Sequence, residues 1–195
     1  MQKRLLPFLS LLLVIWGCGD AGIESDISKN VAIDPIEVQL SVPPIFVGQR
    51  VDETPPINTN TGAIDISDNE FSEYLDDAER FTINKITYSI VGFPQNSEAD
   101  LDLSIDIEIG QNTQELLSIL VADAQSNVTD VVLFEAGTPG NVNLNAIADL
   151  ENALLNGQTF AMDIEIIGRD VLLREEEVNF QLVFKFDVTT RIKLD

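Results

Sequence analysis

The sequence contains no histidine, and Cys18 is its single cysteine. Histidine is the usual general base near neutral pH and the commonest zinc ligand, so its absence excludes a Ser-His-Asp hydrolase and removes the main donor of zinc sites. A single cysteine excludes an intrachain disulfide, so stability must come from the hydrophobic core. Glycine-rich phosphate loops of the Walker or dinucleotide type are also missing.

Basic residues are scarce. Eleven Lys and Arg stand against 33 Asp and Glu, which gives a net charge of −22. This field repels phosphates, so no nucleic-acid partner is expected. The acidic residues are spread along the whole chain, which is typical of a surface that keeps a protein soluble. The alternative is that carboxylates collect divalent cations or meet a basic partner.

A short hydrophobic segment stands at the N-terminus. Lys3 and Arg4 precede an apolar run over residues 5–16, which Gly17 and Cys18 close. A membrane-spanning helix needs about 20 apolar residues, so this run is too short to be one. Its basic, apolar and small-residue parts are those of a secretory signal over residues 1–17.

The end of the segment, Ile15-Trp16-Gly17-Cys18, resembles the lipobox of bacterial lipoproteins, with Trp16 in place of the usual small or aliphatic residue. The resemblance implies cleavage before Cys18 by signal peptidase II, a diacylglycerol on the Cys18 thiol, and an acyl group such as palmitate on the new amine. Several acyl chains on one residue anchor a protein stably to a membrane, so we expect this protein to contact the membrane through its lipid only. In such lipoproteins an aspartate directly after the lipidated cysteine is associated with retention in the inner membrane, and here that position holds Gly19. The resemblance therefore implies the outer membrane, on either its periplasmic or its cell-surface face. The alternative is ordinary secretion with an incidental thiol.

Downstream of the signal, the pattern predicts a tether followed by one domain. Residues 18–33 are small and polar without sustained periodicity, which indicates a flexible tether, and residues 34–195 are long enough for one hydrophobic core. Period-two alternation predicts strands over 36–42, 101–109, 160–166 and 178–189, the last continuing to Leu194. Exposed loops are predicted over 43–62 and 169–177.

Three further stretches are less regular. The apolar phase changes between residues 81–83 and 86–90, which predicts a bulge near Asn84-Lys85. Residues 113–124 fit either a helix or a strand, and the surrounding strands favour a strand. Residues 128–135 are predicted as another strand.

Two short helices are expected. A capping box, Ser67 to Glu70, would start the first, with Phe71, Tyr74, Leu75 and Ala78 on its buried face. The second would begin near Asn143 or Asn145 and end at Asn156-Gly157. With about seven strands, this predicts an all-β fold, an antiparallel immunoglobulin-like β-sandwich with two short helices. The paired cysteines and core tryptophan of immunoglobulin domains are missing, so the likeness concerns architecture and carries no function.

Carboxylates offer the only candidate metal ligands. Local clusters that could bind calcium comprise Asp65, Asp68, Asn69, Glu70, Asp100 and Asp102, although no spacing matches an EF-hand. Paired carboxylates could also hydrolyse glycosides. However, the predicted outward positions of Asp102, Asp106, Glu108, Asp163 and Glu165 are typical of a solvated strand face, and no aromatic platform accompanies them.

The sequence therefore predicts a non-catalytic lipoprotein of the cell envelope, a binding or structural accessory component at the outer membrane. Its only cofactor would be the lipid on Cys18, with calcium as an alternative, and its partner would be a protein or glycan of the envelope. Loops on a rigid sandwich commonly carry binding, which points to residues 43–62. The alternatives are a calcium-dependent adhesive or glycan-binding module and, more remotely, a carboxylate glycosidase.

Overall fold

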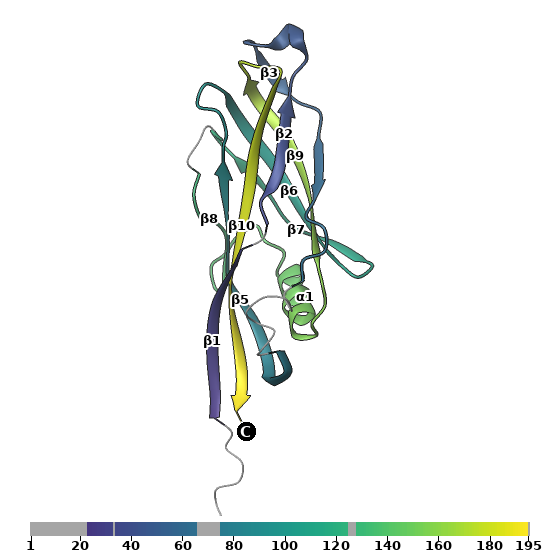
Figure 1. The fold of residues 1–195 in the computed structure, drawn as a ribbon, viewed down its shortest axis with the longest axis vertical. Helices are drawn as coiled ribbons and strands as arrows, with labels where there is room; N and C mark the ends of the chain where they lie inside the picture. Colours follow the sequence, from purple (N-terminus) through teal and green to yellow (C-terminus); the bar gives the residue numbers. More distant parts are fainter. Residues whose placement is uncertain (1–22, 33, 66–74, 125–127, 195) are drawn as a thin grey trace, which may run out of the picture.

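The computed structural model describes residues 23–32, 34–65, 75–124 and 128–194, which form two antiparallel sheets (Figure 1). The first sheet contains β1 (Ile23–Ala32), β2 (Ile36–Ser41), β5 (Ala78–Val91), β8 (Val131–Glu135) and β10 (Glu177–Leu194). The second contains β3 (Arg50–Glu53), β4 (Ile57–Asn60), β6 (Glu98–Ile109), β7 (Asn112–Val121) and β9 (Ala161–Leu172). The predicted all-β sandwich is confirmed.

The strand order identifies a jelly roll. In the first sheet the strand order is β1-β10-β5-β8, and β2 pairs with β10 on the same side as β1. In the second sheet the order is β3-β9-β6-β7, and β4 pairs with β9 on the same side as β3. The first strand therefore pairs with the last, whereas in an immunoglobulin domain it pairs with the second. This connectivity refines the immunoglobulin-like expectation.

One hydrophobic core fills the space between the sheets. Alternate residues of β2, β6 and β10 are buried, and they join residues of β5, β9 and the helix in one cluster. The rings of Phe93 and Phe180 pack edge to face with centroids 5.2 Å apart. Fully burying such a side chain contributes about 1.5–3 kcal/mol.

The predicted bulge is confirmed at Asn84. Ile83 pairs with Val188 and Lys85 pairs with Asp187, so Asn84 has no partner in the register. Its side-chain amide donates hydrogen bonds to Asp187 Oδ1 (3.1 Å) and to Thr189 Oγ1 (2.7 Å). The extra residue allows the apolar side chains on both sides of it to face the core.

The second predicted helix is confirmed as α1 (Leu144–Leu155). Asn143 caps its start by accepting a hydrogen bond from the Asn145 amide (3.0 Å), and Gly157 follows its end with φ of 60°. Ser67–Tyr74 of the first predicted helix lies outside the described residues; Leu75–Asp77 form a 3-10 turn, η2, and Ala78 begins β5. No described helix is both long enough and apolar enough to cross a bilayer.

The structure differs from the expected tether and loops. Ile23–Ala32, within the expected tether 18–33, form β1 with Ile23 opposite Leu194, because an edge strand is held by backbone pairing and needs few apolar side chains. The expected loop 43–62 contains a 3-10 turn, η1 (Pro44–Phe46), and the short edge strands β3 and β4, between which Pro55-Pro56 fall.

The remaining predictions concern strand limits. Residues 113–124 lie mostly in β7, as favoured, and 128–135 contain β8. β9 continues through Leu172, so the expected loop over 169–177 is shorter and comprises residues 173–176.

Candidate binding surface at the apolar tip

One end of the sandwich carries exposed apolar side chains. It is formed by residues 43–49, which include η1, and by the β9–β10 turn, residues 173–176; together we call them the apolar tip. Ile45 is 72% exposed and Phe46 is 37% exposed. In Figure 1 the tip lies at the top, whereas β1 begins and β10 ends at the bottom.

Backbone hydrogen bonds hold the tip in a fixed shape. The Phe46 amide donates to Pro43 O, and the Gln49 amide donates to Phe46 O, both at 2.8 Å. Gly48 donates to Leu173 O at 2.8 Å and adopts φ of 75°, a conformation that favours glycine. The backbone that carries the apolar pair is thus ordered before binding, which lowers the entropy cost of binding.

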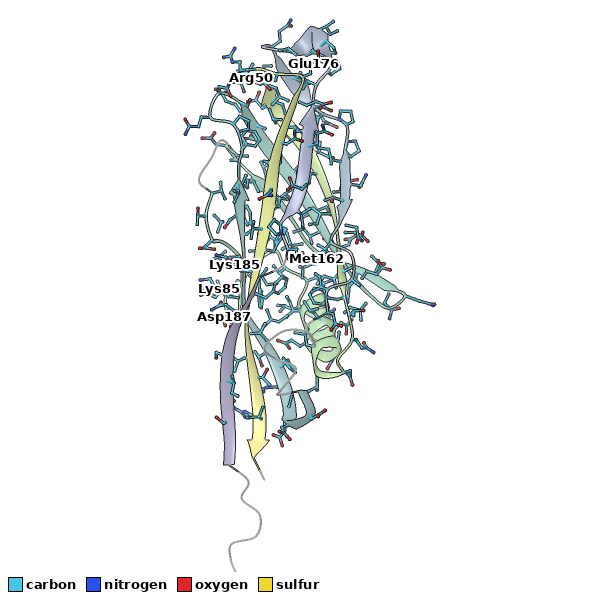
Figure 2. The ribbon with its side chains drawn as sticks, viewed as in Figure 1. Arg50, Lys85, Met162, Glu176, Lys185 and Asp187 are labelled. Atoms are coloured by element: carbon cyan, nitrogen blue, oxygen red, sulfur yellow. The ribbon has the colours of Figure 1, made fainter. Side chains whose placement is uncertain are left out.

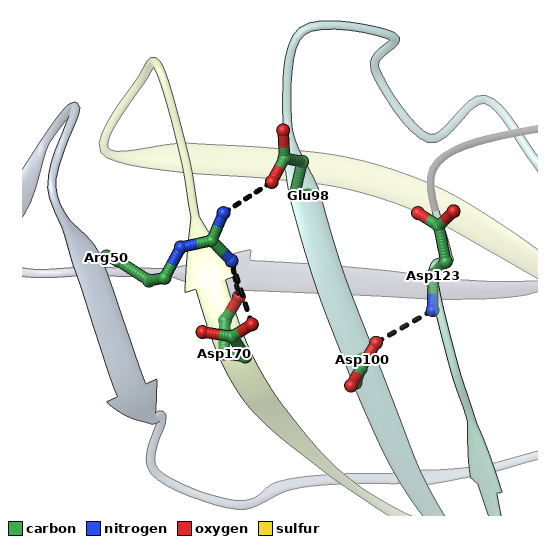
Figure 3. A network of polar contacts seen from close by, with 5 residues as sticks. All are labelled: Arg50, Glu98, Asp100, Asp123 and Asp170. Atoms are coloured by element: carbon green, nitrogen blue, oxygen red, sulfur yellow. Dashed lines mark hydrogen bonds and ion pairs between the residues drawn. The ribbon is translucent and has the colours of Figure 1, made fainter.

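A polar network fastens β3 directly beneath the tip. Arg50 donates one hydrogen bond to Glu98 Oε2 (2.6 Å) on β6 and another to Asp170 O (3.0 Å) on β9, with Asp170 Oδ2 at 2.9 Å (Figure 3). The hydrogen bond to Glu98, then that to Asp170, raises the pKa of Arg50 above its ordinary value. Exposed ion pairs contribute little stability, so the network chiefly fixes the position of β3.

The β9–β10 turn adds charged side chains to the tip. Arg174, Glu175 and Glu176 are exposed in the β9–β10 turn, and the Val42 amide donates to Glu176 O at 2.9 Å. Figure 2 shows Glu176 at the same end as Arg50. The tip therefore combines an ordered apolar centre with a charged rim that carries two carboxylates and one guanidinium.

The structure places the three described candidates for calcium ligands in two regions, with Asp100 and Asp102 on β6 and Asp65 elsewhere. Asp100 accepts a hydrogen bond from the Asp123 amide (2.7 Å; Figure 3), and Asp102 pairs with Arg169 (3.4 Å). Asp65 follows the bridge between Ile64 and Phe160, and Asp100 pairs with Arg169. At about 3.3 Å per residue these two levels of the sheet are about 30 Å apart along the chain. Asp68, Asn69 and Glu70 lie outside the described residues. Within the described ranges, no three Asp, Glu, His or Cys side chains are arranged to hold a metal ion.

The outer face of the second sheet is acidic. Asp106 on β6 stands opposite Asp163 on β9, and both line a groove of about 380 Å³ with Glu165, Ser104, Asn58 and Asn60. The side-chain amide of Asn60 donates a hydrogen bond to the Asp163 carboxylate. The predicted outward positions are confirmed. Like charges directly opposite each other repel, so this arrangement favours solvent or cations over a second anionic surface.

The loop predicted over 43–62 contains Ile45 and Phe46, but the sequence patterns did not single out these two residues, nor did they predict the pairing of Asp106 with Asp163. Pro43-Pro44 before them and Gly48 after them signal the turn. The facing carboxylates depend on strand register, which local alternation does not contain.

Comparisons with known proteins add little. No family model matches the chain, and no curated protein matches it. A solved structure titled Desmodium yellow mottle tymovirus is similar at 10% sequence identity, covering 100% of this chain and 97% of that chain, with a TM-score of 0.36. A likeness this distant gives no support to any particular function.

Proposed function

We propose that this chain is a non-catalytic lipoprotein of the cell envelope, anchored at the outer membrane by lipid on Cys18 and acting as a binding or structural accessory component through its apolar tip. The observation that carries the proposal is the opposite placement of the two ends. β1 begins at one end, only five residues after Cys18, and the exposed pair Ile45 and Phe46 occupies the other end.

The dimensions suit a spacer. β10 is 18 residues long, which at about 3.3 Å per residue corresponds to about 60 Å. Four residues, 19–22, separate Cys18 from β1, and even fully extended they reach about 14 Å. A lipid on Cys18 would keep the β1 end close to the bilayer and present the tip about 60 Å farther out.

The chemistry of the tip suggests the type of partner. Protein interfaces commonly bury a few apolar anchors inside a polar rim. Here the anchors are Ile45 and Phe46, and the rim carries Glu175 and Glu176 beside Arg174, so its net charge is negative. The complementary surface is an apolar pocket bordered by Lys or Arg on an envelope protein.

The anchor is tested by metabolic labelling with a palmitate analogue, followed by fractionation. The wild-type chain should be labelled and membrane-bound, whereas Cys18→Ala should carry no label. If Cys18→Ala is still labelled, the lipid assignment is wrong.

The tip is tested by photo-crosslinking in intact envelopes. A photoreactive residue at Ile45 should give one discrete protein adduct, whose crosslinked peptide lies in an apolar pocket next to basic residues, and Phe46→Asp should abolish it. The matched control places the same group at Thr113, which is exposed in β7. Equal crosslinking at both positions, or none at Ile45, would contradict a recognition role for the tip.

Two assays separate the alternatives. Calcium at about 100 times its Kd would stabilise a calcium-dependent module by about 2.7 kcal/mol, so an unchanged Tm counts against that module. Turnover of glycans, lost in Asp106→Asn and Asp163→Asn, would support the glycosidase instead.

A further inference from the structure

An open seam runs along one side of the sandwich. β8 is an edge strand whose partner among the described strands is β5, and β7 is the corresponding edge of the second sheet. Residues 136–143 cross from β8 to α1, and Asn143 fastens them to β7 by hydrogen bonds from its amide to Leu116 O (2.8 Å) and from its side chain to Glu115 O (2.9 Å). We call residues 131–144 the β8 seam.

The β8 seam has both a hollow and a protruding apolar side chain. The hollow has a volume of about 400 Å³. Most of its lining is apolar, from Val132, Leu133, Phe134, Pro139, Val142 and Leu144, and Glu135, Thr138 and Gly140 complete it. Leu144, the first residue of α1, is 68% exposed, and Val132 is 46% exposed. Leu144 lies outside the buried face of α1, which consists of Ala146, Ile147, Leu150, Ala153 and Leu154, so the fold itself does not account for an apolar residue there.

Two carboxylates beside the β8 seam are neutralised by lysines. With a net charge of −22, two copies repel each other over most of their surface. The acidic residues next to β8 have lysine partners: Lys185 Nζ lies 2.8 Å from Asp130, and Lys85 Nζ lies 3.6 Å from Glu135. Figure 2 shows both lysines on the same side of the molecule. Because these carboxylates are paired with lysines of the same copy, this side repels a second copy less than the facing carboxylates Asp106 and Asp163 do.

We propose that a second copy of this chain docks on the β8 seam and forms a two-fold symmetric homodimer. A two-fold interface requires one patch to complement itself, and the seam carries a knob, Leu144, beside a hollow able to receive it. A register shift interrupts the pairing of β8 with β5 between Ile86 and Thr87. Because a short, bulged edge is a poor template for a continuous sheet, the contact is made by side chains.

The test is the association state of residues 19–195, which contain all the described elements and no cysteine. In sedimentation equilibrium between about 1 and 200 µM, the average mass should rise toward twice that of the monomer. Leu144→Asp should raise the dissociation constant at least tenfold. The matched control is Ile45→Asp, an equally exposed position at the tip, which should leave the constant unchanged.

A second measurement tests whether residue 144 of one copy lies close to residue 144 of the other. Leu144→Cys gives the only thiol in this cysteine-free background, and a short bis-maleimide should join two copies, whereas Ile45→Cys should give little product. The proposal is overturned if the wild-type chain stays monomeric over the whole concentration range. It is also overturned if Leu144→Asp and Ile45→Asp have equal effects on association while circular dichroism shows both variants to be folded. Failure of the tip to bind a partner would leave this result unaffected.

Discussion

Gly168 in β9 lies in a space that a single methyl group would overfill. A Cβ at this position would be 2.8 Å from Val171 Cγ2, 3.0 Å from Leu40 Cδ1 in the other sheet, and 3.0 Å from Thr54 Oγ1. Thr54 is buried, and its hydroxyl accepts a hydrogen bond from the Gly168 amide (3.0 Å). Gly168→Ala therefore forces the core apart and disturbs the link between β9 and the segment joining β3 to β4.

The expected net effect is a loss of about 1–2 kcal/mol. Overpacking a close-packed core costs about 1–3 kcal/mol, and replacing glycine returns about 0.4–1 kcal/mol by restricting the unfolded chain. For a domain of this size each kcal/mol corresponds to about 2–4 °C, so Tm should fall by about 2–8 °C. Urea unfolding followed by far-UV circular dichroism measures the free energy directly.

Gly140→Ala is the matched control, because its Cβ would meet nothing within 4 Å and its φ is not left-handed. It should change the free energy of unfolding by less than about 0.5 kcal/mol. Val171→Ala removes the nearest methyl, so the double variant Gly168→Ala/Val171→Ala should lose less than the sum of the single losses. Wild-type stability of Gly168→Ala, or strict additivity, refutes the steric argument.

Three further predictions concern polar and titratable groups. Thr190 is fully buried and its hydroxyl has no hydrogen-bond partner among the described residues, so Thr190→Val should raise the free energy of unfolding by about 1 kcal/mol; a loss in urea would contradict this. The hydrogen bond from Arg191 lowers the pKa of Asp26 below its ordinary 3.8. The stability that this ion pair contributes is therefore fully present above pH 3.8 and is lost as the pH falls through the lowered pKa. Amide protection of β1, corrected for intrinsic exchange, should follow this loss in wild type but not in Asp26→Asn. Burial raises the pKa of Tyr88 above 10, so its contribution to stability is present below pH 10 and is lost at higher pH. In Tyr74→Phe, which leaves Tyr88 as the single tyrosine, absorbance at 295 nm should rise only above pH 10. A titration midpoint at or below pH 10 would be inconsistent with burial.

Local patterns predicted the elements whose signals are local. The phase change around Asn84 specified the bulge because only an extra residue lets Ile83 and Ile86 share one face. The ends of α1 were also predictable from the sequence. The side chain of Asn143 can accept a hydrogen bond at the start of a helix, and Gly157 can adopt the positive φ that often follows a helix end.

Features that depend on distant partners were not predictable in this way. β1 is held by pairing with β10 more than 150 residues later in the chain, so its own residues need no alternation. β3 and β4 are too short for a periodic signal, and Pro55-Pro56 between them indicate a loop. The jelly-roll order is a property of the pairings themselves. The sequence placed Ile45 in an exposed loop, but the position of that loop at the end opposite the start of β1 follows only from the fold.

The course of β1 and β2 has a mechanical consequence. Together they follow β10 along nearly its whole length, from Ile23 opposite Leu194 to Ser41 opposite Glu177, and the tip begins two residues later. A strand at about 3.3 Å per residue is already close to the full extension of a polypeptide. Tension between an anchor before Ile23 and a partner at the tip would pass through this taut covalent segment, so it would lengthen very little and the hydrophobic core would bear almost none of the load.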